Sequence, residues 1–290
     1  MFGGGNQMSL SKWDMNNIRF HRDENKGPVI VLIGRRDTGK SVLVNDLMSY
    51  QTHIPVGTVI SGTEAGNGFY KPIVPKMFIH HEYSVTLLEN ILRRQQCVVK
   101  QYTREKEHHN GTCSRIQTDP RSFLIMDDCL YDDKWCRDKL MRMVFMNGRH
   151  WKMMLIITMQ YPLGVPPVLR TNIDYVFILR EPIDTNRKRI WENYASMFPT
   201  FESFKMVLDQ TTEDYHCLVI NNNAKSNKLS EMVFWYKANT RRPPYRLCNK
   251  EYWDFAATIP DDDEEDANAE YDPTAHKKRN AGPAIVVRKI

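Results

Sequence analysis

Short unbroken apolar runs recur along the chain and predict strands that are buried on both faces of a sheet. Because these runs lack alternating polar residues, they are typical of strands in a parallel sheet that is covered on both sides. The four clearest runs are Val29–Ile33, Phe123–Met126, Met153–Thr158 and Tyr175–Leu179, and three shorter candidates are Thr58–Ser61, Cys217–Ile220 and Met232–Tyr236.

Between these runs, apolar residues recur at helical spacing. In Ser41–Tyr50, for example, Leu43 and Leu47 lie four residues apart, as do Val44 and Met48. Further helices are predicted over Val85–Lys106, Asp133–Asn147, Asn186–Ser196 and Phe201–Asp209. Strands that alternate with helices favour an α/β fold in which helices flank a largely parallel central sheet.

The character of the sequence changes near both ends and divides the chain into three parts. Residues 1–26 are polar and rich in Gly and Asn, so we expect a loosely structured N-terminal arm with Trp13 and Phe20 as candidate anchors. Residues 27–256 contain the predicted strands and helices and are expected to form the folded domain. Residues 257–290 are rich in Pro, Asp and Lys, which predicts a disordered tail.

The balance of charge favours an anionic partner for the folded domain. The chain has 40 Lys and Arg against 35 Asp and Glu, which gives a formal net charge of +5. Six consecutive acidic residues, Asp261–Asp266, lie in the predicted tail, and leaving them out brings the net charge near +11. A basic body of this kind fits a nucleic-acid partner. Basic residues of the predicted helix Val85–Lys106 are candidates for a DNA-facing surface, and an ordinary solvated helix face explains them equally well.

Several classes of protein are disfavoured. The longest apolar run, Met153–Ile157, has five residues, whereas a membrane-spanning helix needs roughly 20, so no membrane span is expected. Six scattered cysteines favour reduced thiols in a cytoplasm-like compartment over a disulfide framework. Four side chains could supply zinc ligands, but their spacing matches no common zinc motif, so a polar surface insert is favoured. These four are Cys97, His108, His109 and Cys113.

An eight-residue motif directly follows the first predicted strand and predicts a phosphate-binding loop (P-loop). Its residues are Gly34, Arg35, Arg36, Asp37, Thr38, Gly39, Lys40 and Ser41, which match G-x-x-x-x-G-K-[ST]. Glycines let backbone N–H groups converge on phosphate oxygens, and the N-terminus of the following helix adds the positive end of its dipole. In this motif Lys40 neutralises the β- and γ-phosphates and the Ser41 hydroxyl ligates Mg²⁺, so ATP and Mg²⁺ are the expected cofactors. A glycine turn with a surface lysine is the alternative, which the strand–loop–helix context disfavours.

Polar side chains follow two further strands of the predicted sheet. Asp127 comes directly after Phe123–Met126 and is expected to hold Mg²⁺ through water, while Asp128 is the candidate general base. Gln160 follows Met153–Thr158. Because ligands bind beyond the carboxyl ends of parallel strands, we expect Gln160 to lie beside the phosphates and to orient water or sense the γ-phosphate. Strands that end in solvated acids are common, so these assignments depend on the preceding P-loop.

These motifs resemble those of the genome-packaging ATPases of large double-stranded-DNA viruses, the poxvirus and giant-virus type of the FtsK–HerA superfamily. The resemblance covers roughly residues 27–250 and extends to the stretches SGTEAGNGFY, MNGRHWKMM, VLRTNIDYVF, TTEDYHCLVI and VFWYKA. It implies a P-loop NTPase fold of RecA/FtsK–HerA type and an ATPase that translocates double-stranded viral DNA into the capsid. One departure from the pattern is Asp128, where many members carry Glu.

The same resemblance implies partners and a further pair of residues. It implies a homo-oligomeric ring, contacts with double-stranded DNA and with capsid or portal proteins, and a location in the host cytoplasm (the viral factory) or the virion. In such rings a neighbouring subunit's arginine stabilises the transition state, and Arg149 and Arg170 lie in family-like segments. Arg149 precedes the strand Met153–Thr158, which predicts a place at the edge opposite its own phosphates, and a salt bridge is the alternative role for either arginine. A P-loop nucleotide kinase and a nucleotide-gated capsid assembly factor remain alternative functions.

Overall fold

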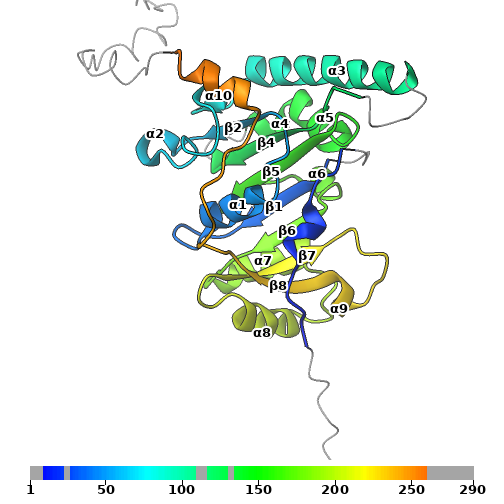
Figure 1. Cartoon of the computed structure of the whole chain (residues 1–290). Helices are drawn as coiled ribbons and strands as arrows, with labels where there is room; N and C mark the ends of the chain where they lie inside the picture. Colours follow the sequence, from blue (N-terminus) through cyan, green and yellow to red (C-terminus); the bar gives the residue numbers. More distant parts are fainter. Residues whose placement is uncertain (1–8, 23–26, 109–115, 130–133, 260–290) are drawn as a thin grey trace, which may run out of the picture.

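An eight-stranded sheet runs through the protein and has helices on both faces (Figure 1). The computed structural model describes residues 9–22, 27–108, 116–129 and 134–259. The strand order is β3-β2-β4-β5-β1-β6-β7-β8. The strands are β1 (Val29–Ile33), β2 (Gly57–Ser61), β3 (Ile79–His80), β4 (Ser122–Asp127), β5 (Met153–Met159), β6 (Tyr175–Ile178), β7 (His216–Asn221) and β8 (Val233–Lys237).

Helices connect most of the strands. They are α1 (Lys40–Ser49), α2 (Glu64–Asn67), α3 (Val85–His108), α4 (Lys134–Arg137), α5 (Lys139–Asn147), α6 (Pro167–Arg170), α7 (Asp184–Tyr194), α8 (Phe201–Thr211), α9 (Leu229–Met232) and α10 (Lys250–Ala256), with 3-10 turns η1 (Met15–Ile18) and η2 (Lys76–Phe78). Within the described parts of the chain, no helix has both the length and the apolar character needed to cross a bilayer.

The sheet is parallel from β3 to β6 and antiparallel at β7 and β8. All seven predicted strands are present, and β3 is an additional two-residue strand. The predicted α/β class with a largely parallel sheet is therefore confirmed. Since the carboxyl ends of parallel strands meet at one edge of a sheet, β1, β4, β5 and β6 all end where a ligand site is expected.

Alternate residues of the central strands pack into two separate hydrophobic layers, as the pleat of a strand requires. Val31 and its odd-numbered neighbours in β1 face the layer formed by α3, α5, α7 and α8. Leu32 and Ile30 face the opposite layer, which is formed by α1 and the N-terminal segment. Burial on both faces explains why β1 is apolar throughout and why β4 and β5 contain the unbroken apolar runs Phe123–Met126 and Met153–Ile157.

The N-terminal arm is not loosely structured over residues 9–22. Trp13, Met15 and Phe20 are 3%, 1% and 1% exposed and belong to the hydrophobic layer that contains α1. The backbone N–H of Trp13 donates to the carbonyl oxygen of Trp235 in β8 at 2.8 Å. The expectation of a loose arm is therefore wrong for this part of the chain, because Met15, Ile18 and the two candidate anchors Trp13 and Phe20 are buried, while Leu10 is partly buried.

The single helix predicted over Asp133–Asn147 is also wrong, because the chain forms α4 and α5 with Asp138 between them. The Asp138 carboxylate accepts the N–H of Leu140 at 2.7 Å, which caps a new helix at this point. The long helix predicted from Val85 is confirmed as α3. The predicted disordered tail lies outside the described residues from position 260 onwards.

Candidate nucleotide-binding site

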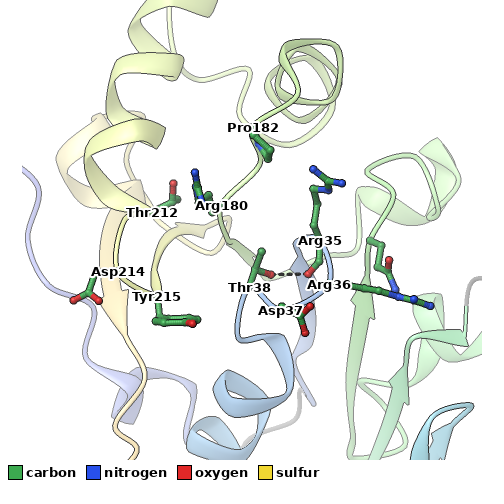
Figure 2. Close-up of a pocket in the computed structure, with 10 residues that line it drawn as sticks. Arg35, Arg36, Asp37, Thr38, Arg180, Pro182, Thr212, Asp214 and Tyr215 are labelled. Atoms are coloured by element: carbon green, nitrogen blue, oxygen red, sulfur yellow. Dashed lines mark hydrogen bonds between the residues drawn. The ribbon is translucent and has the colours of Figure 1, made fainter.

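The P-loop joins the buried strand β1 to helix α1, and two of its positions require glycine. A Cβ atom on Gly34 would lie 2.7 Å from Thr38 Oγ1 and 2.9 Å from Leu179 Cβ, and Gly39 has a left-handed φ of +94°. The Thr38 hydroxyl donates to the carbonyl oxygen of Arg35 at 2.7 Å, which closes the loop on itself (Figure 2). The loop therefore has the tight turn that brings backbone N–H groups to bear on a phosphate.

Lys40 begins helix α1, and its ammonium group lies inside the loop. Nζ donates to the carbonyl oxygens of Gly34 and Arg35, each at 2.8 Å, and the residue is 9% exposed. Burial lowers the pKa of Lys40, while the carboxylates of Asp128 and Asp127 raise it. This cation stands at the N-terminus of α1, where the helix dipole also favours an anion.

The sheet order brings the predicted site residues to one edge. Strand β5 lies between β1 and β4 and is parallel to both. The P-loop after β1, the pair Asp127 and Asp128 at the end of β4, and Gln160 after β5 therefore emerge side by side. Sequence reasoning placed each residue after its own strand, and the order of the strands places them together.

Asp127 is held by two hydroxyl groups. Its Oδ1 accepts a hydrogen bond from the Thr158 hydroxyl at 2.5 Å, and its Oδ2 accepts one from the Tyr70 hydroxyl at 3.0 Å. Burial raises the pKa of Asp127, and the bonds from Thr158 and Tyr70 lower it. Tyr70 is itself fully buried, and its backbone N–H donates to the buried carboxylate of Glu64 at 2.9 Å. The carboxylate of Asp127 therefore has a fixed orientation.

Asp128 has an unusual backbone conformation and is paired with Gln160. Its φ is 54°, and its N–H donates to the Thr158 hydroxyl oxygen at 3.0 Å. Gln160 Nε2 donates to both carboxylate oxygens of Asp128, at 2.8 and 2.6 Å. A left-handed aspartate costs energy unless its surroundings hold it, and such strain gathers at functional sites. The amide of Gln160 is thus directly beside the candidate base.

The oxygen donors fit a magnesium ion. Ser41 is the second residue of α1, and Asp127 is the last residue of β4 on the same edge of the sheet. A hydroxyl and a carboxylate are ligands that Mg²⁺ takes together with water and the phosphates of a nucleotide. Of the four zinc candidates, Cys97 and His108 lie on α3, and His109 and Cys113 lie outside the described residues.

Two cavities flank this edge, and Arg36 and Gln160 line both of them. The first, of about 650 Å³, is drawn in Figure 2 and has a size that suits a nucleotide. It is lined by Arg35, Arg36, Asp37, Thr38, Gln160, Arg180, Pro182, Thr212, Asp214 and Tyr215. The second, of about 560 Å³, is lined by Arg36, Gly62, Thr63, His81, Glu82, Asp128, Gln160 and Tyr161. The P-loop and Gln160 therefore stand between a larger cavity and one that adjoins Asp128.

Arg149 lies in the turn between α5 and β5, at the edge of the sheet opposite the P-loop. Its Nη2 is 3.2 Å from Asp174 Oδ1 and donates to the carbonyl oxygen of Asn172 at 3.0 Å. The other oxygen of Asp174 accepts the N–H of Val29 at 2.8 Å. Within its own chain, Arg149 therefore helps to fix the starts of β1 and β6.

Arg170 lies at the end of α6 and is also engaged within the chain. Its Nε donates to the carbonyl oxygen of Val165 at 2.7 Å, and its guanidinium lies over the Tyr194 ring at 5.5 Å from the centroid. Among the described residues that line the two cavities there is neither Arg149 nor Arg170, but Arg180 lines the larger one (Figure 2). Arg180 directly follows the apolar run Tyr175–Leu179, so the strand-end signal that identified Gln160 could have found it.

Three further residues of the site were not assigned a role from the sequence. Tyr70 and Tyr215 lie in stretches that carry the family resemblance, and Thr158 ends a predicted strand, but nothing in these segments indicates the contacts by which the three residues reach the site. On α3, four basic side chains are exposed and Arg94 is half-buried. This exposure fits a DNA-facing surface and an ordinary solvated helix face equally well. The exposed residues are Arg93, Lys100, Arg104 and Lys106.

Proteins of large DNA viruses are similar to this chain. Uncharacterized protein L437 of Acanthamoeba polyphaga mimivirus is 39% identical over 238 residues, which cover 82% of this chain and 80% of that protein. Uncharacterized protein 075L of Invertebrate iridescent virus 6 is 39% identical over 236 residues, covering 80% and 86%. No family model matches the chain.

Solved structures share the fold at low identity. The genome packaging NTPase B204 of Sulfolobus turreted icosahedral virus 2, in complex with AMPPCP, has a TM-score of 0.50 at 16% identity and covers 74% of this chain and 99% of its own. The pCW3 conjugation coupling protein TcpA, with ATPgS, has a TM-score of 0.50 at 14% identity and covers 88% and 71%. At such identities the likeness concerns the fold alone.

Proposed function

We propose that this chain is a Mg²⁺-dependent ATPase that packages viral DNA. The chain belongs to the family of large-DNA-virus proteins that includes L437 and 075L, and it has the fold of FtsK–HerA-type P-loop NTPases. One observation carries the proposal: Lys40, Asp127, Asp128 and Gln160 meet at one sheet edge beside a cavity of about 650 Å³. A cation, a metal-binding carboxylate and a candidate base at that edge are what phosphoryl transfer to water needs.

Each residue has a distinct role in the proposed reaction. The backbone of Gly34–Gly39 and the ammonium group of Lys40 bind the β- and γ-phosphates. Ser41 and Asp127 would hold Mg²⁺, which neutralises developing charge on the phosphates when it is bound. Asp128 accepts the proton of the attacking water, and Gln160, whose amide touches both of its oxygens, orients that water.

The proposed coupling to DNA is supported by a structural likeness and by charge. B204 is described as a genome packaging NTPase, and the basic balance of this chain outside its acidic run suits a phosphate backbone. In the proposed motor, copies of the chain form a ring, DNA passes its basic surface, and capsid or portal proteins hold the ring to the particle. The proposed location is the viral factory in the host cytoplasm or the virion.

An arginine acting between subunits completes the proposed site. Arg149 lies far from its own nucleotide edge, so it can serve a neighbouring subunit, but it must then leave or share its ion pair with Asp174. Arg170 is the other candidate. Either would stabilise charge on the transferred phosphoryl group, an effect of about 10³–10⁵ in rate.

The test is ATP turnover by the full chain with and without double-stranded DNA, with the mass of the assembly measured in nucleotide. We expect turnover that DNA stimulates, and Lys40→Ala should abolish it. Normal turnover in Lys40→Ala would contradict the P-loop assignment. Transfer of phosphate to a nucleotide acceptor, without stimulation by DNA, would instead identify a kinase.

A further inference from the structure

The turn before β7 holds an aromatic residue in a conformation that usually requires glycine. The N–H of His216 donates to the carbonyl oxygen of Glu213 at 3.0 Å, so residues 213–216 form a β-turn. Its two central residues, Asp214 and Tyr215, have φ of 49° and 60°. Two positive φ values are the signature of a type I′ turn, in which Asn-Gly and Asp-Gly are strongly preferred. A tyrosine at the second central position is strained, and such strain persists where the surroundings or the function require it.

The strained turn points the Tyr215 ring at the P-loop. The residue is 68% exposed and lines the larger cavity together with Arg35 and Thr38. A Cβ atom placed on Gly39 would be 3.4 Å from the Tyr215 Cδ1 atom, so the ring lies along the start of α1. Figure 2 shows the ring beside the loop, between the turn and Thr38.

Neighbouring contacts hold the turn in place. The carboxylate of Asp214 is paired with Lys237 Nζ of β8 at 2.5 Å, and the Thr212 hydroxyl donates to the carbonyl oxygen of Leu208 at 2.7 Å. Because the central residue Asp214 and the residue before the turn, Thr212, both bond to the fold, the exposed ring of Tyr215 has a defined position beside the cavity.

We propose that Tyr215 is the platform on which the base of the bound nucleotide stacks, an inference that rests on the proposed nucleotide site. With the phosphates held by the P-loop, the nucleoside extends into the cavity that the ring lines. An exposed aromatic ring can stack on any of the bases, because every base has a π-face. The tyrosine thus contributes affinity for the nucleoside and none for the phosphates.

The experiment compares the binding of Mg·ATP with that of inorganic triphosphate in the full-length chain. Tyr215→Gly should weaken ATP binding about tenfold, within the range caused by removing a stacking partner, and should leave triphosphate binding within twofold. Tyr215→Phe should keep both affinities. Because glycine suits the left-handed position, Tyr215→Gly should not lower the Tm. Phe255→Ala, which removes an exposed ring on α10, serves as the matched control and should change neither affinity.

Each outcome bears on the proposal. Unchanged ATP affinity in Tyr215→Gly would overturn the stacking role and leave the proposed ATPase standing. An equal loss for ATP and triphosphate would also overturn it, because the turn would then act on the P-loop. A wild-type chain that binds neither ligand would overturn the proposed function itself, and the stacking role with it.

Discussion

The hydroxyl of Thr158 joins the two acids of the site, so Thr158→Val tests how they are held. The side chain is fully buried on β5. Its hydroxyl donates to Asp127 Oδ1 at 2.5 Å and accepts the N–H of Asp128 at 3.0 Å. Valine is also β-branched and keeps the packing of the strand. The change leaves one carboxylate oxygen and one backbone N–H without this partner.

The magnitude follows from these two bonds. A hydrogen bond to a charged group contributes about 1.5–3 kcal/mol, and a buried donor left unsatisfied costs about 1–3 kcal/mol. Burial of the valine methyl group offsets a part of that loss. We therefore expect the free energy of unfolding to fall by about 2–4 kcal/mol at pH 7.

The loss of stability in Thr158→Val should depend on pH in a defined direction. Burial raises the pKa of Asp127 above its ordinary 3.8, and the bond from Thr158 lowers it, so Thr158→Val raises this pKa further. A carboxyl with a raised folded pKa contributes stability that is complete below the unfolded pKa and is lost as the pH rises through the folded pKa. The variant loses more stability over that pH interval. The difference between its free energy of unfolding and that of the wild type should therefore be larger at pH 7 than at pH 4.

Urea unfolding of both proteins at the two pH values measures this difference. Thr103→Val is the matched control, since Thr103 is exposed on α3 and its hydroxyl bonds to the Val99 carbonyl at 2.9 Å. The control should stay within about 0.5 kcal/mol of the wild type. A deficit of that small size for Thr158→Val, or an equal deficit at both pH values, would refute the reasoning.

Three further predictions concern the site and the arm. Asp128→Asn should keep Mg·ATP bound but stop hydrolysis in a turnover assay, and an equal loss of binding would mean that the roles of Asp127 and Asp128 are misassigned. Subunits with Lys40→Ala and with Arg149→Ala should each be inactive but recover part of the ATPase activity in mixed rings. No recovery at any ratio, with mixed rings confirmed by mass, would leave Arg149 with its ion-pair role alone. Trp13→Ala should lower the free energy of unfolding by about 3–5 kcal/mol in urea titrations, and a change below about 1 kcal/mol would show that the arm contributes little.

The phosphate loop is predictable from sequence because its constraints are local. The close approach of Gly34 to Thr38 and the positive φ of Gly39 lie within the loop, and Lys40 follows at a fixed spacing, whereas the close approach of Gly34 to Leu179 depends on the sheet. The acids after β4 and Gln160 after β5 are predictable once a parallel sheet is assumed. Their direct contact depends on the order of the strands, which the sequence pattern does not encode.

Most of the errors and omissions concern contacts between distant segments, and one concerns a local helix cap. Trp13 is buried because Trp235, more than 200 residues later, bonds to its backbone, and no local pattern marks that pairing. Tyr70 reaches Asp127 across 57 positions, and Thr158 reaches it across 31. In the predicted helix over Asp133–Asn147, helical spacing of the apolar residues hid the break that Asp138 introduces by capping α5.

The two edge strands of the sheet, β3 and β8, limit how copies of this chain can associate. At one border β3 has two residues. At the other, the N-terminal segment covers β8: the N–H of Trp235 donates to the carbonyl oxygen of Ser11 at 3.1 Å, and its carbonyl accepts the N–H of Trp13 (Figure 1). Short or covered borders oppose the addition of a strand from another molecule. Copies of this chain are therefore expected to associate through side-chain surfaces and not by extending one sheet into the next. Deletion of residues 1–22 is expected to expose β8 as an unpaired edge strand, which promotes aggregation.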